Sequence, residues 1–334
     1  MSRSRIAAIV NPRSAAGKLG CDSPTLTSDL DKWYGGRACR VDWLTTRAAG
    51  DATALARAAL ENGADTIISV GGDGTHNEVI NGFFSAEGER LNPDATLAVI
   101  DQGTGGDFKR SLGLGMKAGD GIAALKKGGT ARIDLGAVEY TDSEGNAARR
   151  YFGNIASLGL SGDVDRHMAG RTRRPGTGKR AFSLATMRVF LGYRNPAVSV
   201  SLDGGPSEGH TVCVLAAANG RYFGGGMNVA PGAMLDDGLL DVVCLGDFHL
   251  YDFVLRGQHL YDGTHLELDK VWHRRARTLS AQCKEMRDVL VDIDGECLGK
   301  LPATVSILPK ALRVIVGDCA AVGRRDASHV GAAG

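Results

Sequence analysis

The sequence has no long apolar run. No segment approaches the ~18 consecutive apolar residues that a membrane-spanning helix needs. The apolar run Ile6–Val10 ends at Asn11-Pro12 and is too short for the core of a signal peptide. We therefore expect a cytoplasmic protein that is either soluble or peripherally associated with a membrane.

Cysteine is scarce and shows no metal-binding pattern. The seven cysteines are odd in number and never occur as Cys-x-x-Cys, which disfavours a zinc site or a complete disulfide framework. An excess of one charge is also absent, because Lys plus Arg is 39 and Asp plus Glu is 38. This balance argues against a nucleic-acid partner, which would require a strongly basic surface.

Glycine, by contrast, is abundant. It supplies 47 of the 334 residues, about twice its usual share. Proline supplies only 9, so the two together stay below the level typical of low-complexity chains. The glycines are therefore expected at particular places in a folded chain.

The order of predicted elements indicates two domains, in agreement with the chain length. In the first part, short apolar runs alternate with helical segments, which predicts an α/β domain with a parallel sheet covered by helices. The expected strands are 6–10, 41–44, 66–70 and 96–100, and the expected helices are 51–61, 75–84 and 120–126.

Strands dominate after residue 135 and predict a mainly antiparallel β domain. The expected strands are 150–157, 197–202, 211–217, 239–245 and 289–293, with helices at 180–193 and 250–261. A last strand, 312–316, fits either domain. The predicted domains are 1–135, with 309–317 as a candidate addition, and 136–308, followed by a disordered tail at 318–334.

The sharpest local signal is Gly71-Gly72-Asp73-Gly74-Thr75, which follows a buried strand and opens a helix. Glycine lets the backbone approach a ligand closely, and a helix N-terminus suits a phosphate. An acid such as Asp73 belongs there only if Mg²⁺ mediates, or if ribose or protein donors bind it. The alternative is a tight capped turn, but three glycines around one acid favour phosphate binding.

Two further loops repeat this arrangement. Gly103-Thr104-Gly105-Gly106 follows the strand 96–100, and Asn11–Lys18 follows the first strand. The second of these is not a Walker A loop, because its glycine spacing and the residue after Lys18 do not match. Loops at the carboxyl ends of parallel strands meet at one edge, where α/β sheets bind ligands. The sequence thus predicts a nucleotide site without a P-loop.

In order and spacing, these motifs resemble the diacylglycerol kinase catalytic family, whose superfamily includes sphingosine, ceramide and bacterial lipid kinases. The matching segments are Asn11–Ser14, Gly71–Gly82, Gly103–Phe108, Asn219–Met227, Ala230–Asp241 and Asp294-Gly295-Glu296. NAD kinases share the first glycine loop, whereas the motifs of the second half select the lipid kinases. The resemblance implies the two-domain architecture of lipid kinases and NAD kinases.

The resemblance also implies ATP and Mg²⁺ as cofactors. The nucleotide-binding residues that it implies are Asn11, Thr46, Gly71, Gly72, Asp73, Gly74, Thr75, Gly103 and Thr104. Asp73 is thereby also a candidate catalytic residue, near the Mg²⁺ that bridges the phosphates of ATP.

Glu296 matches the general base of the family's Asp-Gly-Glu motif, with Asp294 beside it. An alcohol that attacks the γ-phosphorus needs a carboxylate within hydrogen-bond reach. Asp294-Gly295 is equally a good hairpin turn, and from the residues alone the two interpretations are even.

The resemblance implies two more sets of residues. Asp237 matches the side-chain ligand of a Mg²⁺ site in bacterial members, with the carbonyls of Met234 and Leu239 nearby; a simple turn is the alternative. Asp163 and Asp165 match a substrate-proximal segment, in which an Asp of sphingosine kinases recognises the head group. Their alternative is pairing with nearby arginines.

Three positions depart from the family pattern. Asp101 stands where the family usually has Pro, Gly106 where it has Asn, and Ala15 where glycine is common. Because of Asp101 and Gly106, the contacts of the loop Gly103-Thr104-Gly105-Gly106 with phosphate or lipid are left open.

The segment 166–188 contains seven Lys or Arg residues and no acid. It leads into the predicted helix 180–193 and could contact anionic lipid headgroups, at about 1 kcal/mol per charge near the surface. The alternative is a solvated loop followed by a core helix.

The leading hypothesis is an ATP-dependent lipid kinase that phosphorylates a hydroxyl of a diacylglycerol-like or sphingoid lipid. Its alternatives are a kinase of a soluble acceptor such as NAD and an inactive nucleotide-binding regulator. The intact Asp73 and Glu296 speak against the regulator. The sequence leaves the oligomeric state open, with a homodimer as one option.

Overall fold

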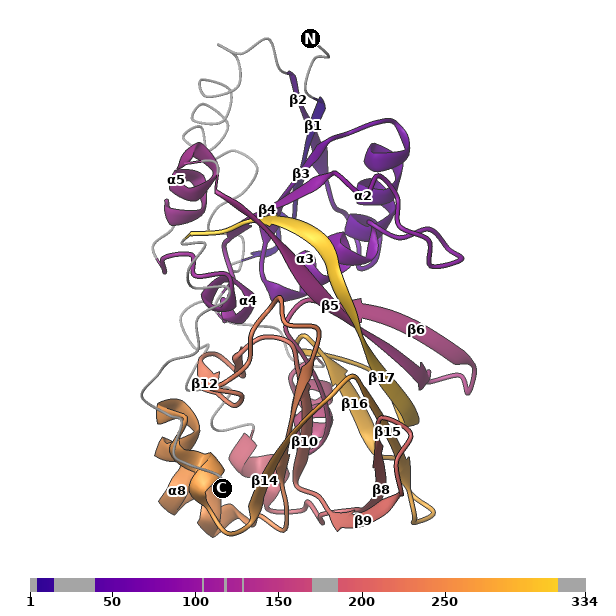
Figure 1. The fold of residues 1–334 in the computed structure, drawn as a ribbon, viewed down its shortest axis with the longest axis vertical. Coiled ribbons are helices and arrows are strands. Elements are labelled where there is room, and N and C mark those ends of the chain that lie inside the picture. The colour runs from indigo at the N-terminus through magenta and orange to yellow at the C-terminus, as the bar shows by residue number, and fades with distance from the viewer. Residues whose placement is uncertain are drawn as a thin grey trace. The chain divides into compact units, whose positions relative to one another are not determined.

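The structure is a computed structural model that describes residues 5–14, 40–103, 105–116, 119–127, 129–169 and 186–317 (Figure 1). Its described residues form two compact units. Unit 1 contains those up to Ile133 together with 310–317, and unit 2 contains those of Asp134–Pro309.

Unit 1 is built on a parallel sheet in the order β4-β3-β1-β2. Its strands are β1 (Arg5–Val10), β2 (Arg40–Thr45), β3 (Thr66–Gly71) and β4 (Thr96–Asp101). Its helices are α2 (Asp51–Glu61), α3 (Asp73–Asn81), α4 (Asp107–Ser111) and α5 (Asp120–Lys127). The strands β1, β3 and β4 are buried almost throughout, as continuous apolar runs in a covered parallel sheet require.

Three helices of unit 1 pack on this sheet. α2 contacts β1, α3 contacts β3 and α5 contacts β4. α2 and α3 also contact each other, where Glu78 accepts hydrogen bonds from the N–H groups of Gly50 and Ala52 at the start of α2.

Unit 2 is mainly antiparallel, and its central strands run in the order β14-β13-β10-β7-β16-β17. The long strands β5 (Thr130–Thr141) and β17 (Glu296–Ile315) each have one end in unit 1 and the other in unit 2. The C-terminal part of β17 pairs with β4 in parallel at Arg313 and Val314.

The other strands of unit 2 are short. They are β6 (Ala147–Phe152), β7 (Ile155–Gly159), β8 (Ala197–Leu202), β9 (Glu208–Thr211), β10 (Val214–Ala218), β11 (Tyr222–Phe223), β12 (Met227–Asn228), β13 (Leu240–Leu245), β14 (Val271–Ala276), β15 (Thr278–Cys283) and β16 (Leu290–Ile293). The helical elements are α6 (Leu160–Ala169), α8 (Leu250–Asp262) and the 3₁₀ turn Thr264–Glu267. Phe152, Leu215, Val242 and Ile293 belong to the main buried cluster between these strands.

The predicted fold class is confirmed, since a parallel α/β part is followed by a mainly antiparallel β part. Some predicted bounds were wrong. The expected strand 150–157 is two strands, because the chain turns at Gly153-Asn154, and the expected strand 211–217 divides between β9 and β10. The expected strand 312–316 is only the end of the 20-residue β17.

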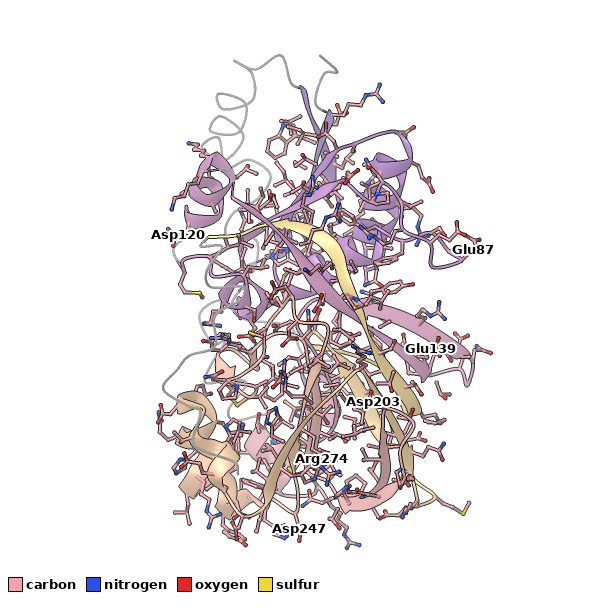
Figure 2. The ribbon with its side chains drawn as sticks, viewed as in Figure 1. Glu87, Asp120, Glu139, Asp203, Asp247 and Arg274 are labelled. Carbon is pink, nitrogen blue, oxygen red and sulfur yellow. The ribbon has the colours of Figure 1, made fainter. Side chains whose placement is uncertain are left out.

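Exposed charges of both signs occur in each unit; Glu87 in unit 1 and Asp247 and Arg274 in unit 2 are examples (Figure 2). Within the described ranges, no helix has both the length and the apolar character needed to cross a membrane.

Candidate functional site

The carboxyl ends of β1, β3 and β4 lie level with one another. Val10 pairs with Val70, and Gly71 pairs with Asp101. The residues that follow these strands therefore start from the same edge of the sheet, as the loop positions in the sequence predict.

Polar side chains gather at this edge. The side-chain amide of Asn11 donates a hydrogen bond to Thr75 Oγ1 at 2.9 Å. The backbone of Thr46 joins them, because its N–H donates to the Val10 carbonyl at 3.0 Å. Three predicted nucleotide-binding residues are thus brought together in unit 1.

The two glycine loops touch at Gly72 and Gly103. A Cβ atom on Gly103 would lie 2.8 Å from the Cα of Gly72, and one on Gly71 would lie 2.5 Å from the Thr75 side chain. Neither distance is compatible with a side chain, so these glycines are required by close backbone approach. Thr104, the remaining predicted residue of the second loop, lies outside the described residues.

Asp73 ties the two loops together. Its carboxylate accepts hydrogen bonds from the N–H groups of Gly106 at 3.0 Å and Phe108 at 3.2 Å, with Asp107 N–H at 3.4 Å. The acid in the glycine loop is therefore bound by protein donors, one of the alternatives that its position allowed.

A buried polar chain that sequence reasoning missed lies behind these loops. Ser69 Oγ is 2.7 Å from His76 Nδ1, and His76 Nε2 is 3.7 Å from Asp101 Oδ1. Burial acts to raise the pKa of Asp101, but the neighbouring His76 ring and the Gly103 N–H hold it below its ordinary value. A lone histidine on a helix gives no signal of such a partner.

In unit 2, Asp294 and Gly295 form the turn between β16 and β17, with φ of 51° and 86°. Two positive φ values are typical of a tight hairpin turn. The Asp294 carboxylate accepts hydrogen bonds from the N–H groups of Gly153, Asn154 and Ile155 at 2.9–3.2 Å. The turn that the sequence offered as an alternative is therefore present, and Asp294 clamps it to the start of β7.

Glu296 is the first residue of β17 and follows this turn directly. Its side chain is 36% exposed, and its Oε2 lies 3.6 Å from Arg150 Nη2. A partly exposed carboxylate beside a guanidinium is available to accept a proton from a bound hydroxyl.

Asp237, the predicted side-chain ligand of Mg²⁺, contacts two protein groups. One oxygen of Asp237 accepts the Leu239 N–H at 3.1 Å, and the other is paired with the guanidinium of Arg275. Within the described parts of the chain, no group of three or more His, Cys, Asp or Glu side chains is placed to hold a metal. Asp237 is thus paired with Arg275, and its role as a Mg²⁺ ligand stays a prediction.

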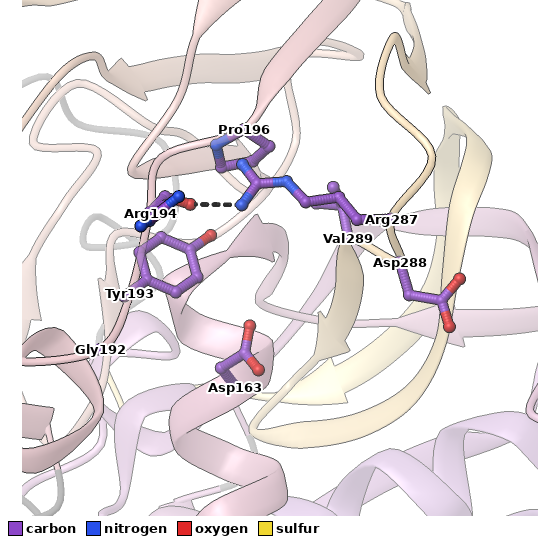
Figure 3. A pocket seen from close by; sticks show the side chains of 8 residues that line it. All are labelled: Asp163, Gly192, Tyr193, Arg194, Pro196, Arg287, Asp288 and Val289. Atoms are coloured by element: carbon purple, nitrogen blue, oxygen red, sulfur yellow. Dashed lines mark hydrogen bonds between the residues drawn. The ribbon is translucent and has the colours of Figure 1, made fainter.

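The two acids of the predicted substrate-proximal segment lie on α6 and have different surroundings. Asp163 is paired with Arg166 at 2.7 Å, and burial raises its pKa. Asp163 lines a polar cavity of about 250 Å³ together with Tyr193 and Arg287. Figure 3 shows these side chains. Asp165 lies near the buried Asp292 carboxyl on β16, and burial together with the charge of Asp165 raises the pKa of Asp292.

Comparison with known proteins identifies the family. A model described as the diacylglycerol kinase catalytic domain matches residues 5–138, and one described as the YegS C-terminal NAD kinase beta sandwich-like domain matches residues 154–316. A diacylglycerol kinase of Mycobacterium tuberculosis is 31% identical over 268 residues, which is 80% of this chain and 82% of that protein. The chain belongs to the diacylglycerol kinase family.

A second relative agrees with this membership, and a solved structure shares the fold. A diacylglycerol kinase of Bacillus subtilis is 30% identical over 276 residues, or 81% of this chain and 84% of that protein. A crystal structure of a diacylglycerol kinase from Bacillus anthracis has the same fold, with a TM-score of 0.67 at 21% identity over 96% of this chain and 100% of that one. The prediction of a lipid kinase that uses ATP is confirmed at the level of the family.

The structure explains one departure from the diacylglycerol kinase pattern. Gly106 has φ of 65° and stands at the start of α4. Asn and Gly are the residues that adopt this left-handed conformation most readily, so glycine replaces asparagine without a change of backbone. Asp101 is a second departure. Its side chain accepts a hydrogen bond from the Gly103 N–H at 3.0 Å, which a proline at this position could not do.

The remaining predictions fall largely on residues that the structure does not describe. Of the basic segment 166–188, residues 170–185 lie outside the described ranges, and residues 186–190 are helical. Ala15, Gly17 and Lys18 of the first loop also lie outside them.

Proposed function

We propose that this member of the diacylglycerol kinase family transfers the γ-phosphate of ATP to a hydroxyl of a diacylglycerol-like or sphingoid lipid, with Glu296 as general base. The observation that carries the proposal is the placement of Glu296. Its partly exposed carboxylate directly follows a turn that Asp294 fixes through three backbone hydrogen bonds.

Unit 1 is the proposed ATP-binding unit. The N–H groups at the start of α3, next to Gly72, bind phosphate oxygens, while Asn11 and Thr75 supply polar groups at the same edge. Mg²⁺ bound with ATP would neutralise charge on the phosphates during transfer. Asp73 and the loop residues hold the two glycine loops in register for this ligand.

The proposed step is a single in-line transfer. The carboxylate of Glu296 takes the proton of the lipid hydroxyl as the hydroxyl oxygen forms its bond to the γ-phosphorus. The bond between that phosphorus and the bridging oxygen breaks, and ADP leaves with the electron pair. Glu296 then releases the proton to solvent.

Asp163 is the proposed contact with the polar head of the lipid, because it lines a polar cavity of unit 2. Asp165 is not among the described residues that line this cavity. We propose that the protein meets its lipid by peripheral contact with a membrane surface, in which the basic sequence 166–188 takes part.

An acceptor panel tests the proposal. The purified protein is incubated with ATP and Mg²⁺ and with mixed micelles of diacylglycerol, sphingosine or ceramide, and separately with NAD; phosphorylated products are measured by mass spectrometry. We expect a phosphorylated lipid and no NADP. Exclusive NADP formation would indicate the soluble-acceptor kinase, and ATP binding without any product would indicate the regulator.

A further inference from the structure

Asp101, the last residue of β4, is an acid at the sheet edge where ATP is proposed to bind. Its side chain is only 6% exposed, although it stands where the family pattern usually has proline. Its Oδ1 accepts the N–H of Gly103 at 3.0 Å. The Asp101 carboxylate therefore holds the first residue of the second glycine loop, 103–106.

A second contact connects Asp101 to the segment that carries the first glycine loop. Its Oδ1 lies 3.7 Å from His76 Nε2 on α3, and His76 Nδ1 lies 2.7 Å from Ser69 Oγ on β3. Ser69 and His76 flank the loop Gly71–Thr75 in the chain. The two glycine loops are thus connected through buried polar groups, in addition to the hydrogen bonds that Asp73 accepts.

Gly106, the other departure from the family pattern in this loop, lies against the same carboxylate. A Cβ on Gly106 would lie 2.9 Å from Asp101 Oδ2, which is closer than Cβ atoms approach a neighbouring heavy atom. Met116 Cε would be 3.3 Å away, but Met116 is 51% exposed and its side chain can move. Asp101 is buried and held through Oδ1, so its displacement would break the bond to Gly103. Asparagine at 106 therefore conflicts with the carboxylate at 101.

We propose that Asp101 is a positioning residue for the second glycine loop of the ATP site, and that glycine at 106 makes room for its carboxylate. The inference rests on the proposed function of unit 1 as the ATP-binding unit. Asp101 fixes one end of the loop through Gly103, and Asp73 fixes the other end through Gly106. Gly103 also touches Gly72 of the first loop, so a shift of Gly103 disturbs both loops. The two departures from the family pattern form one coupled pair.

Four variants separate the parts of this proposal. Asp101→Ala removes the oxygen to which the Gly103 N–H donates. Asp101→Asn removes the charge but keeps a side-chain oxygen that can accept that N–H. Gly106→Asn places a Cβ against Asp101 Oδ2. The double variant, Asp101→Ala with Gly106→Asn, carries the same Cβ without the carboxylate that it would meet.

Gly63→Asn is the matched control for Gly106→Asn. Gly63 also has a left-handed φ, 85° against 65° for Gly106, so the two changes carry the same kind of backbone strain. A Cβ on Gly63 would meet Arg5 Nη1 at 3.5 Å, an ordinary contact. Gly63 precedes β3 whereas Asp101 ends β4, so the two positions lie at opposite ends of paired strands.

The Kd for ATP, measured by calorimetry with Mg²⁺ present, is the first readout. We expect Asp101→Ala and Gly106→Asn each to raise this Kd by about tenfold, because either change deprives the Gly103 N–H of its fixed acceptor. The double variant should bind ATP no more weakly than Asp101→Ala alone, since the added Cβ then meets no carboxylate. Asp101→Asn and Gly63→Asn should bind ATP as the parent does.

Thermal unfolding without nucleotide is a second readout, and it tests the coupled pair alone. Gly106→Asn should lower the Tm of the parent, but it should lower the Tm of the Asp101→Ala variant much less. Gly63→Asn should change the Tm equally in both backgrounds, because distant substitutions act additively. The difference between the two glycine positions measures the contact between the Cβ at 106 and the carboxylate at 101.

The outcomes distinguish this inference from the proposed function. An equal effect of Gly106→Asn on Tm in both backgrounds would overturn the coupled pair. A parental Kd for ATP in folded Asp101→Ala or Gly106→Asn would overturn the positioning role, and so would a loss of affinity in Asp101→Asn as large as that in Asp101→Ala. If the parent binds no ATP, the proposed function fails and the positioning role with it; the Tm series still decides the pair.

Discussion

Asp73 and Asp294 each bind consecutive backbone N–H groups of another segment, at positions 106–108 and 153–155 respectively. Both were predicted as acids with a chemical role. In the structure each carboxylate satisfies backbone donors that would otherwise be unpaired in a partly buried loop, and the chemical roles stay predictions. These two side chains therefore determine where the loops lie.

Asp294→Asn tests this function at the scale of one residue. An asparagine has a single acceptor oxygen, and its amide group would face N–H donors. We expect a loss of about 1–3 kcal/mol in the free energy of unfolding, measured with urea.

The control for this change is Asp269→Asn, whose side chain is 79% exposed. It should stay within about 0.5 kcal/mol of the parent. Equal stability of the two variants would show that the Asp294 clamp contributes nothing measurable.

At the scale of elements, the strand-end loops were predictable and the contacts between them were not. The glycine pattern located the edge formed by β1, β3 and β4, because local sequence determines where a strand ends and a helix begins. The contact of Gly72 with Gly103 and the bonds of Asp73 depend on tertiary packing, which no local pattern reports.

The helix α6 shows a different reason for failure. Its sequence contains Gly162, a poor helix former, and no helix was expected there; Asp163 and Asp165 were identified only as part of a substrate-proximal segment. In the structure, a Cβ on Gly162 would lie 2.6 Å from the Leu290 Cβ. Close packing of α6 on β16 therefore requires glycine at position 162. The same glycine lowers the helix propensity of the segment, so the sequence does not predict the helix.

Gly103→Ala tests the contact between the two glycine loops. The added Cβ would meet the Gly72 backbone at 2.8 Å, so the loops must separate. If this edge binds ATP, we expect the Kd for ATP to rise by about tenfold or more, which equals ~1.4 kcal/mol, as measured by calorimetry.

Gly119→Ala provides the matched control in unit 1, because no atom of the described residues, apart from its chain neighbours, lies within 4 Å of the position of its Cβ. Its Kd for ATP should equal that of the parent. An unchanged Kd in Gly103→Ala would place the nucleotide elsewhere.

At the scale of the whole molecule, β17 joins the two units through one continuous strand. It starts with Glu296 in unit 2 and ends in unit 1, where it pairs with β4. The sequence predicted only its last apolar residues, because Gly299, Pro302 and Pro309 interrupt the pattern expected of a strand. The fold class was predictable from the order of elements, whereas this connection was not.

The candidate site residues are also divided between the two units. The glycine loops and their partners belong to unit 1, and the Asp294–Glu296 turn belongs to unit 2. The family match covers both parts in order. We therefore expect that loss of the Glu296 carboxylate in unit 2 removes phosphate transfer, while ATP binding by unit 1 persists.

Glu296→Gln tests that claim most directly, with lipid phosphorylation and ATP affinity measured on the same preparation. We expect kcat of this variant to fall by about 10²–10⁴-fold, the usual contribution of a general base, while the Kd for ATP stays unchanged. The exposed carboxylate of Glu139, changed to Gln, serves as the control and should retain full activity. Parental kcat in Glu296→Gln, or an equal loss of transfer and ATP affinity, would contradict the account.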